Sequence, residues 1–123
     1  FPAGQGLKVP QIGWNQIEIV KPECPIFKGV ENGSHVYFVH SFYPQPEDDS
    51  IAACRTSYGV EFASAIWKDN VFATQFHPEK SQKVGLTILQ NFVDLAKWER
   101  CPSPPWPSGE AICACARWTA LVP

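Results

Sequence analysis

The sequence has no methionine, no apolar run of membrane-spanning length and no excess of positive charge. A transmembrane helix needs about 20 consecutive apolar residues, and polar or charged residues interrupt every apolar stretch before that length. Ten Lys and Arg against twelve Asp and Glu give a formal net charge of −2, so the basic surface that attracts nucleic acids or anionic membranes is missing. We therefore exclude an integral membrane protein and expect no nucleic-acid or membrane partner.

The first ten residues, FPAGQGLKVP, also lack the charged start and the apolar core of a signal peptide. Because no initiating methionine is present either, we expect the chain to begin inside a longer protein. Its 123 residues, of which 45% are hydrophobic, are enough for one small folded domain.

The five cysteines are odd in number and unevenly spread. Cys24 and Cys54 lie far apart in the body of the chain, whereas Cys101, Cys113 and Cys115 lie in its last 23 residues. A disulfide-stapled secreted domain usually has an even set, so we expect a protein of a reducing compartment. The pair Cys113-x-Cys115 lacks the two-residue gap and the further ligands of a zinc site, so no metal site is predicted.

A change in composition divides the chain. After Arg100 it reads CPSPPWPSGEAICACARWTALVP, with only two charged residues, and its closely spaced prolines exclude a helix or a central strand there. We interpret residues 1–97 as a partial domain and residues 98–123 as a Pro-, Cys- and Trp-rich tail outside it. A proline-rich ligand for an aromatic groove is the alternative interpretation of the tail.

The body is predicted to form strands followed by one helix. Residues 35–42 (HVYFVHSF) alternate Val36, Phe38, His40 and Phe42 with the side chains of the other face. Residues 59–67 and 71–76 are two further predicted strands, joined by a short polar hairpin turn. A helix is predicted from an N-cap at Ser81, and one apolar stripe should pack on the sheet: Ile88, Leu89, Phe92, Leu95 and Ala96.

Between the last predicted strand and the helix lies QFHPEKS, the segment that carries chemistry. Pro78 pushes His77 into an extended conformation, and Glu79 follows close enough to accept the proton of one imidazole nitrogen. A base with such an orienting carboxylate is half of a nucleophilic triad. An isolated His-x-Glu is more often a surface histidine beside an unrelated glutamate, and spacing alone leaves that alternative open.

Three motifs in this order, IGWNQ, YFVHSF and ATQFHPEKSQKVGL, closely resemble the glutamine amidotransferase component of imidazole glycerol phosphate synthase, a class I (Cys-His-Glu) amidotransferase of histidine biosynthesis. The resemblance covers about residues 5–96. It implies an α/β fold, namely the C-terminal portion of a class I glutamine amidotransferase domain, with a flavodoxin-like mixed sheet flanked by helices and the first half missing. It also implies a cytoplasmic protein, or a plastid one if the source is a plant.

The resemblance assigns roles to individual residues. It implies that His77 is the general base and Glu79 its orienting acid, and that the segment of Ser41 and Phe42 holds the α-amino-acid end of glutamine. It also places three residues at the interface with the cyclase, a β/α-barrel partner, near the ammonia passage: Trp14, Asn15 and Lys80. For His40, a packed strand histidine and a role in the site stay equally open. The implied chemistry, glutamine hydrolysis to glutamate and ammonia, requires no metal or organic cofactor.

The sequence departs from the family at the nucleophile. The family's catalytic Cys lies on a sharp strand-to-helix turn at G-x-C-x-G spacing, because glycine permits the strained turn and the close approach of backbone donors. None of the five cysteines here has that setting, so we expect no nucleophile in this chain and an inactive C-terminal fragment. Two alternatives stay open: another class I amidotransferase, of the anthranilate or carbamoyl phosphate synthase type, and a non-catalytic remnant that binds the partner.

Overall fold

The computed structural model describes Phe1 and residues 6–98 of the chain. Within these residues the chain forms six strands, three short 3₁₀ helices and one α-helix. In chain order they are β1 (Gln11–Gln16), β2 (Glu18–Ile19), η1 (Pro25–Phe27), β3 (His35–His40), η2 (Asp49–Ile51), β4 (Ala52–Tyr58), β5 (Val60–Lys68), β6 (Val71–Thr74), η3 (Pro78–Lys80) and α1 (Gln82–Trp98). Apart from the end of α1, the predicted tail lies outside the described residues.

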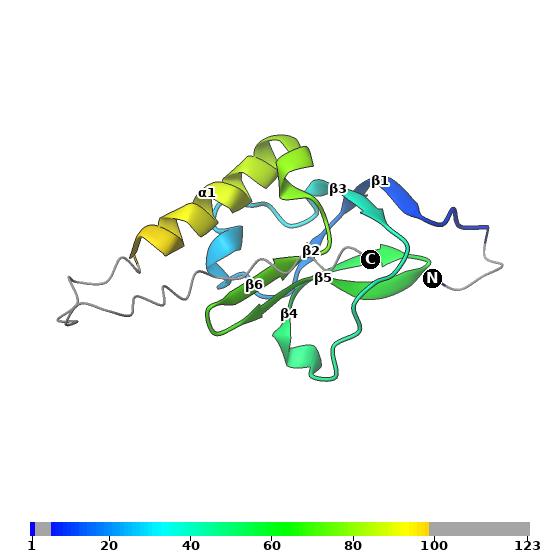
Figure 1. The fold of residues 1–123 in the computed structure, drawn as a ribbon, viewed down its shortest axis with the longest axis horizontal. Helices are drawn as coiled ribbons and strands as arrows, with labels where there is room; N and C mark the ends of the chain where they lie inside the picture. The colour runs from blue at the N-terminus through cyan, green and yellow to red at the C-terminus, as the bar shows by residue number, and fades with distance from the viewer. Residues whose placement is uncertain (2–5, 99–123) are drawn as a thin grey trace, which may run out of the picture.

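The strands form two sheets, and every pair among the described strands is antiparallel. β1 pairs with β3, whereas the second sheet has the order β2-β4-β5-β6. In Figure 1, α1 and η1 lie on one side of the four-stranded sheet, and the β1–β3 pair lies at one end of the molecule. The α/β class is confirmed, although a mixed sheet needs a parallel pair and none occurs among the described strands.

The three predicted strands are confirmed as β3, β5 and β6, and the hairpin turn joins β5 to β6 at Asp69 and Asn70. β1, the two-residue β2 and β4 were not predicted. The burial of β1 alternates, but its apolar residues Ile12 and Trp14 are exposed while Gln11 is buried. The first three residues of β4 are all buried, so neither strand shows buried apolar residues alternating with exposed polar ones.

The core lies between the two sheets and α1. Val36 and Phe38 of β3 are fully buried and belong to one cluster with apolar residues from both sheets, η1 and α1: Ile17, Ile26, Phe27, Ala53, Phe62, Phe76 and Ile88. His40 lies on the same face, so the predicted alternation is confirmed to that point. It is wrong for Phe42, which is 77% exposed because β3 ends at His40 and the chain turns away.

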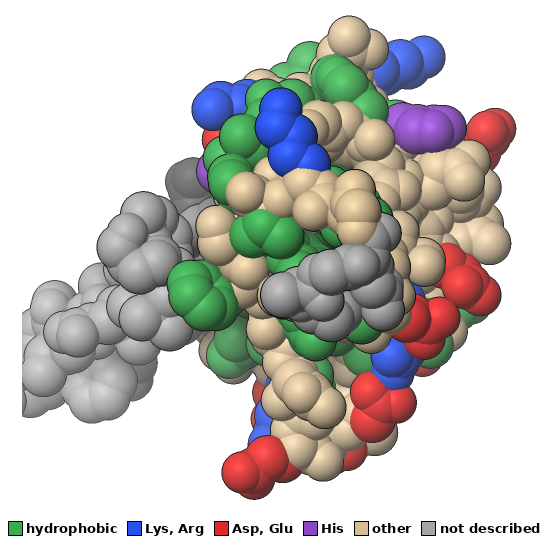
Figure 2. Space-filling view, turned by 90° about the vertical axis from the view of Figure 1, so that its right-hand side faces the viewer, with side chains coloured by type: hydrophobic (Ala, Val, Ile, Leu, Met, Phe, Trp, Pro, Cys, Tyr) green, Lys and Arg blue, Asp and Glu red, His purple; other side chains and the backbone are tan. Residues whose placement is uncertain are grey.

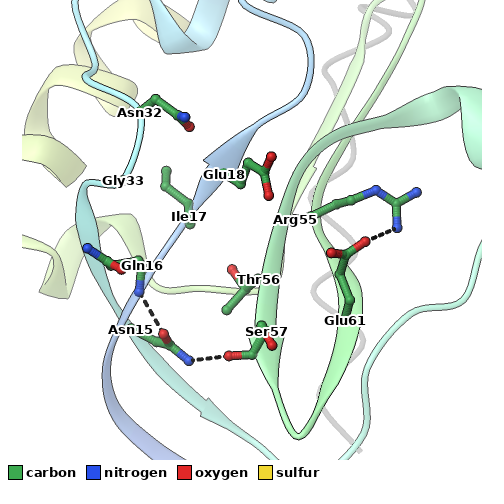
Figure 3. A pocket seen from close by; sticks show the side chains of 10 residues that line it. All are labelled: Asn15, Gln16, Ile17, Glu18, Asn32, Gly33, Arg55, Thr56, Ser57 and Glu61. Atoms are coloured by element: carbon green, nitrogen blue, oxygen red, sulfur yellow. Dashed lines mark hydrogen bonds and ion pairs between the residues drawn. The ribbon is translucent and has the colours of Figure 1, made fainter.

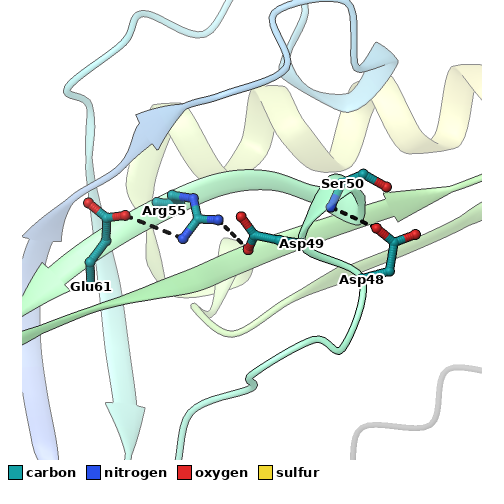
Figure 4. Close-up of polar contacts among 5 residues, drawn as sticks. All are labelled: Asp48, Asp49, Ser50, Arg55 and Glu61. Carbon is teal, nitrogen blue, oxygen red and sulfur yellow. Dashed lines mark hydrogen bonds and ion pairs between the residues drawn. The ribbon is translucent and has the colours of Figure 1, made fainter.

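Arg55 ties η2 and β5 to β4 on the outer side of the second sheet (Figure 4). Its guanidinium makes ion pairs with Asp49 and, at 3.3 Å, with Glu61. In the adjoining turn, the Asp48 carboxylate accepts a hydrogen bond from the backbone N–H of Ser50, which lowers the pKa of that carboxyl. The positive charge of Arg55 is therefore paired with carboxylates of the same chain and does not contribute to a basic surface.

The face at the right-hand side of Figure 1 shows the same balance of charge. Figure 2 shows Lys and Arg side chains scattered over this face rather than gathered in one patch, with acidic side chains along its lower right margin. On this face, the arrangement agrees with the absence of a basic surface expected from the net charge.

The apolar stripe of α1 packs mainly on η1, η3 and β3. Ile88 is buried and Leu89, Phe92 and Leu95 are partly buried, as predicted, whereas Ala96 is exposed because the helix extends beyond the elements it covers. The Asn91 amide also joins the helix to η1 by donating to the carbonyl oxygens of Ile26 and Lys28, at 2.9 and 2.7 Å. α1 therefore packs mainly on η1 and on η3, which follows His77, and covers little of either sheet.

Gly85 permits the close approach of α1 to η3. A Cβ at this position would lie 1.8 Å from the carbonyl oxygen of Pro78, which is a backbone atom and cannot rotate away. The absence of a side chain at Gly85 thus sets the distance between the helix and the segment that carries His77 and Glu79.

We expect Gly85→Ala to lower the free energy of unfolding by about 1–3 kcal/mol, the usual cost of overpacking a tight contact. Helix propensity alone predicts the opposite sign, a gain of about 1 kcal/mol for Ala over Gly. Urea unfolding of the 123-residue chain, followed by circular dichroism, measures the difference. Leu86→Ala is the matched control, because Leu86 is 62% exposed and its loss should change stability by less than about 0.5 kcal/mol. A Gly85→Ala variant more stable than the wild type would contradict the contact.

Candidate functional site

The segment between β6 and α1 joins the two sheets. The backbone N–H of Gln75 donates to the carbonyl of Ser64 on β5, at 2.8 Å, and the N–H of His77 donates to the carbonyl of Tyr37 on β3, at 2.9 Å. Phe76 lies between them and is buried in the core. His77 is therefore held at the point where the chain passes from one sheet to the other.

Ser81 fixes the other end of this segment. Its hydroxyl donates to the carbonyl of His77 at 2.6 Å and accepts from the backbone N–H of Tyr37 at 3.0 Å. Ser81 was predicted as the N-cap of the helix, and its carbonyl does accept the first helical hydrogen bond, from Gly85. The prediction is wrong for the side chain. Its hydroxyl oxygen, which would cap the helix by accepting from a backbone N–H of the first turn, accepts instead from the N–H of Tyr37.

His77 and Glu79 form a hydrogen-bonded pair. His77 Nδ1 lies 3.0 Å from Glu79 Oε1, and the two side chains are 38% and 58% exposed. Pro78 is buried at the start of η3, where it keeps His77 extended. The carboxylate can accept the Nδ1 proton, which leaves Nε2 as the nitrogen able to take or give a proton. The structure therefore brings together the two side chains whose contact the spacing predicted.

His40 lies close to His77 but has a different environment. Its Nδ1 is 2.9 Å from the carbonyl oxygen of Phe42, an atom that only accepts, so Nδ1 carries the ring proton. Burial lowers the pKa of His40, and the nearby charge of His77 lowers it further, while the Phe42 carbonyl acts in the opposite direction. His40 is accordingly neutral, and its Nε2 is buried with no hydrogen-bond partner among the described residues.

Ser41 and Phe42 follow directly after the end of β3. Ser41 is partly buried, whereas Phe42 projects from the surface. The sequence left the role of His40 open. Its position directly before Ser41 was the feature that could have linked it to this turn.

The family comparison agrees with this geometry. The profile of the family "Glutamine amidotransferase class-I" matches residues 5–96, which span every described strand and nearly all of α1. The chain belongs to the class-I glutamine amidotransferase family.

Individual relatives indicate a narrower group within this family. Over 92 residues the chain is 60% identical to the imidazole glycerol phosphate synthase subunit HisH of Syntrophotalea carbinolica and, equally, to that of Geobacter sulfurreducens. It is 58% identical over 88 residues to the HisH subunit of Methanocaldococcus jannaschii. These matches cover 72–75% of this chain and 44% of each relative, so the chain spans less than half the length of the HisH proteins it matches.

The three residues expected at an amidotransferase–cyclase interface differ in their surroundings. Trp14 is 47% exposed, and its ring packs edge-on against Tyr37 on the neighbouring strand, at 5.8 Å between centroids. Lys80 is exposed on η3 and makes no ion pair with a described residue. Asn15 instead uses its amide internally: it donates to the carbonyl of Ser57 and accepts from the N–H of Gln16.

Asn15 also closes one end of a polar cavity of about 280 Å³ (Figure 3). The cavity lies where the chain leaves β1 for β2 and diverges from β4, and Figure 3 shows the Arg55–Glu61 ion pair at its opposite side. His77 and Glu79 are not among the residues that line it.

Neither cysteine in the described residues has the environment of an amidotransferase nucleophile. Cys24 and Cys54 are free and buried, and burial raises the pKa of both thiols, to about 12 for Cys54. The Cys54 sulfur lies 3.2 Å from the hydroxyl of Ser64, deep in the second sheet. Cys101, Cys113 and Cys115 lie outside the described residues.

The described residues contain no group of three or more His, Cys, Asp or Glu side chains placed to hold a metal ion. The only α-helix that they form, α1, is too short and too polar to cross a membrane.

The burial of Cys54 predicts an unreactive thiol. With a pKa of about 12, almost none of it is thiolate at pH 8, and the thiolate is the species that alkylates. We expect iodoacetamide to leave Cys54 and Cys24 unmodified in the folded chain at pH 8 and to label both after unfolding in guanidinium chloride. Peptide mass spectrometry resolves the two sites. Fast labelling of Cys54 in the folded chain would show that a competent nucleophile had been overlooked.

Proposed function

We propose that this chain carries the His–Glu half of the catalytic machinery of a glutamine amidotransferase that supplies ammonia to imidazole glycerol phosphate synthase in histidine biosynthesis. The observation that carries the proposal is the 3.0 Å contact between His77 and Glu79, held between two sheets in a chain of this family. The names of the HisH relatives support the choice of synthase. The partner would be the cyclase, a β/α-barrel subunit or domain, and the location would be the cytoplasm.

The geometry suits glutamine hydrolysis through a thioester. A Cys thiolate attacks the side-chain amide carbon of glutamine, and His77 Nε2 delivers a proton to the departing ammonia. His77 then takes a proton from water as the water attacks the thioester, which releases glutamate and the thiol. Glu79 holds the Nδ1 proton throughout, so that Nε2 faces the reaction. The thiolate would come from outside the described residues, because Cys24 and Cys54 are buried and protonated.

The surface around Trp14 and Lys80 would contact the cyclase. Tyr37 of β3 links the two positions: Trp14 lies opposite it on β1, and the loop that carries Lys80 is bonded to both polar groups of its backbone. A movement of the partner at this surface would reach His77 through the same strand. Asn15 would support Trp14 from within the chain, because its amide is already bonded to β4.

A non-catalytic, partner-binding function is the second candidate, and the burial of both described thiols favours it for this chain alone. A chain of this kind would bind the cyclase without releasing ammonia from glutamine. A different class I amidotransferase, of the anthranilate or carbamoyl phosphate synthase type, would instead bind the synthase subunit of its own pathway. Binding assays with the three purified partners separate these possibilities.

The catalytic assignment can be tested in a chimera, the Geobacter sulfurreducens HisH subunit with residues 5–96 of this chain in place of the matching segment. His77→Ala should lower glutamine-dependent synthesis by about 10²–10⁴-fold or more, because the proton carrier is lost. Glu79→Gln should lower it by the same factor or less, since the imidazole remains but its orientation and tautomer are disturbed.

Two controls accompany these variants. Synthesis driven by an added ammonium salt should survive both changes, because free ammonia bypasses the thioester. His35→Ala, at an exposed histidine on β3, should behave as the unmodified chimera. Full glutamine-dependent synthesis in His77→Ala would show that this segment is only a structural turn.

The interface assignment predicts a different phenotype. In the same chimera, Trp14→Ala and Lys80→Ala should spare the His77–Glu79 pair but weaken the cyclase contact, so that ammonia is lost before it is used. We expect the ratio of product formed to glutamine hydrolysed to fall below that of the unmodified chimera. Lys83→Ala, at an exposed lysine on α1, is the matched control and should keep the ratio. Unchanged ratios in both test variants would place the cyclase surface elsewhere.

A further inference from the structure

His40 is held more firmly than an ordinary strand histidine. It is only 9% exposed, and three aromatic rings surround it: Phe1, Phe38 and Phe62, with centroids 5.3, 5.6 and 5.3 Å from the imidazole. Gln11 lies directly opposite on β1 and is 3% exposed. Cross-strand partners share one face of a sheet, so the imidazole is enclosed by the core and by its neighbour.

Among the described residues, the one hydrogen bond of this imidazole goes to the turn that follows it. Nδ1–H donates to the carbonyl of Phe42, two residues along the chain, at 2.9 Å. β3 ends at His40, so the ladder with β1 no longer holds Ser41 or Phe42. The Phe42 side chain projects from the surface, so its burial does not anchor the turn. Among the described contacts, the bond from His40 is therefore the one that fixes the Phe42 carbonyl.

His40 cannot replace His77 as a base. Its Nε2 is buried and has no hydrogen-bond partner among the described residues, whereas the His77 side chain is 38% exposed and oriented by Glu79. The backbone of His77 is nonetheless bonded to β3 through the carbonyl of Tyr37, three residues before His40. The turn that His40 holds thus follows the same strand that anchors the proposed base.

We propose that His40 is a positioning residue, whose Nδ1–H holds the Ser41–Phe42 turn in the conformation that receives the α-amino-acid end of glutamine next to His77. This inference rests on the proposed amidotransferase function. It assigns His40 to substrate binding rather than to proton transfer, so its loss should weaken the binding of glutamine more than it slows the chemical step.

The first test uses the 123-residue chain labelled with ¹⁵N-histidine. Nuclear magnetic resonance distinguishes a protonated from an unprotonated ring nitrogen, and we expect His40 to carry its proton on Nδ1 at pH 7.5. In His40→Phe, which keeps a ring but removes the donor, the amide signals of Ser41 and Phe42 should shift. A proton on Nε2, or unchanged signals for the turn, would overturn the proposal.

The second test uses the chimera with its cyclase and compares two substitutions. His40→Phe should raise KM for glutamine by about three- to tenfold, the cost of one hydrogen bond, with kcat changed by less than about twofold. His40→Asn, whose side-chain N–H lies near the position of Nδ1, should restore KM towards the unmodified value despite its smaller volume. Ammonium-driven synthesis should be the same in both.

The outcomes separate this proposal from the one it rests on. If His77→Ala abolishes glutamine hydrolysis while His40→Phe leaves KM unchanged, only the role of His40 is wrong. A fall in kcat and in ammonium-driven synthesis together, not rescued by His40→Asn, would show a merely structural histidine and also overturn the proposal. If His77→Ala has no effect, both proposals fail.

Discussion

The position of the His77–Glu79 pair depends on the two hydrogen bonds of the Ser81 hydroxyl. This buried oxygen accepts from the N–H of Tyr37 and donates to the carbonyl of His77, while the N–H of His77 returns to the carbonyl of Tyr37. Both backbone groups of Tyr37 on that edge of β3 are thereby satisfied by the loop. A buried N–H left without a partner costs about 1–3 kcal/mol, so the loop and the strand stabilise each other's geometry.

Packing reinforces the same arrangement from the side of the helix. Gly85 lets the first turn of α1 contact the backbone of Pro78, and the amide of Asn91 holds the middle of the helix to η1. The imidazole of His77 can therefore stay partly exposed without becoming free to move, because the backbone on both sides of it is fixed. A proton-transfer group needs this combination of access and fixed orientation.

The same side chains acquire different chemistry from different surroundings. His77 is partly exposed and paired with a carboxylate, whereas His40 is enclosed by aromatic rings and bonded to a carbonyl, so only His77 is suited to carry protons. The thiol of Cys54 is similarly made inert by burial, which raises its pKa although the hydrogen bond with Ser64 lowers it. Residue type thus determines which reactions a side chain could perform, and burial and hydrogen bonds determine whether it can perform them here.

The sequence alone determined the features that depend on neighbours along the chain: strand β3, the β5–β6 hairpin, the helix from residue 82, and the proximity of His77 and Glu79 across Pro78. It did not predict β1, β2 or β4, because β1 has its apolar side chains on the exposed face, β2 is only two residues long, and β4 begins with three consecutive buried residues. Only the tertiary structure decided that the Ser81 hydroxyl bonds β3 and the His77 carbonyl instead of capping the helix, that Asn15 is used internally, and that His40 points to the Phe42 carbonyl. These are contacts between segments that the sheets bring together, or choices between competing partners, and neither is encoded in the spacing of residues along the chain.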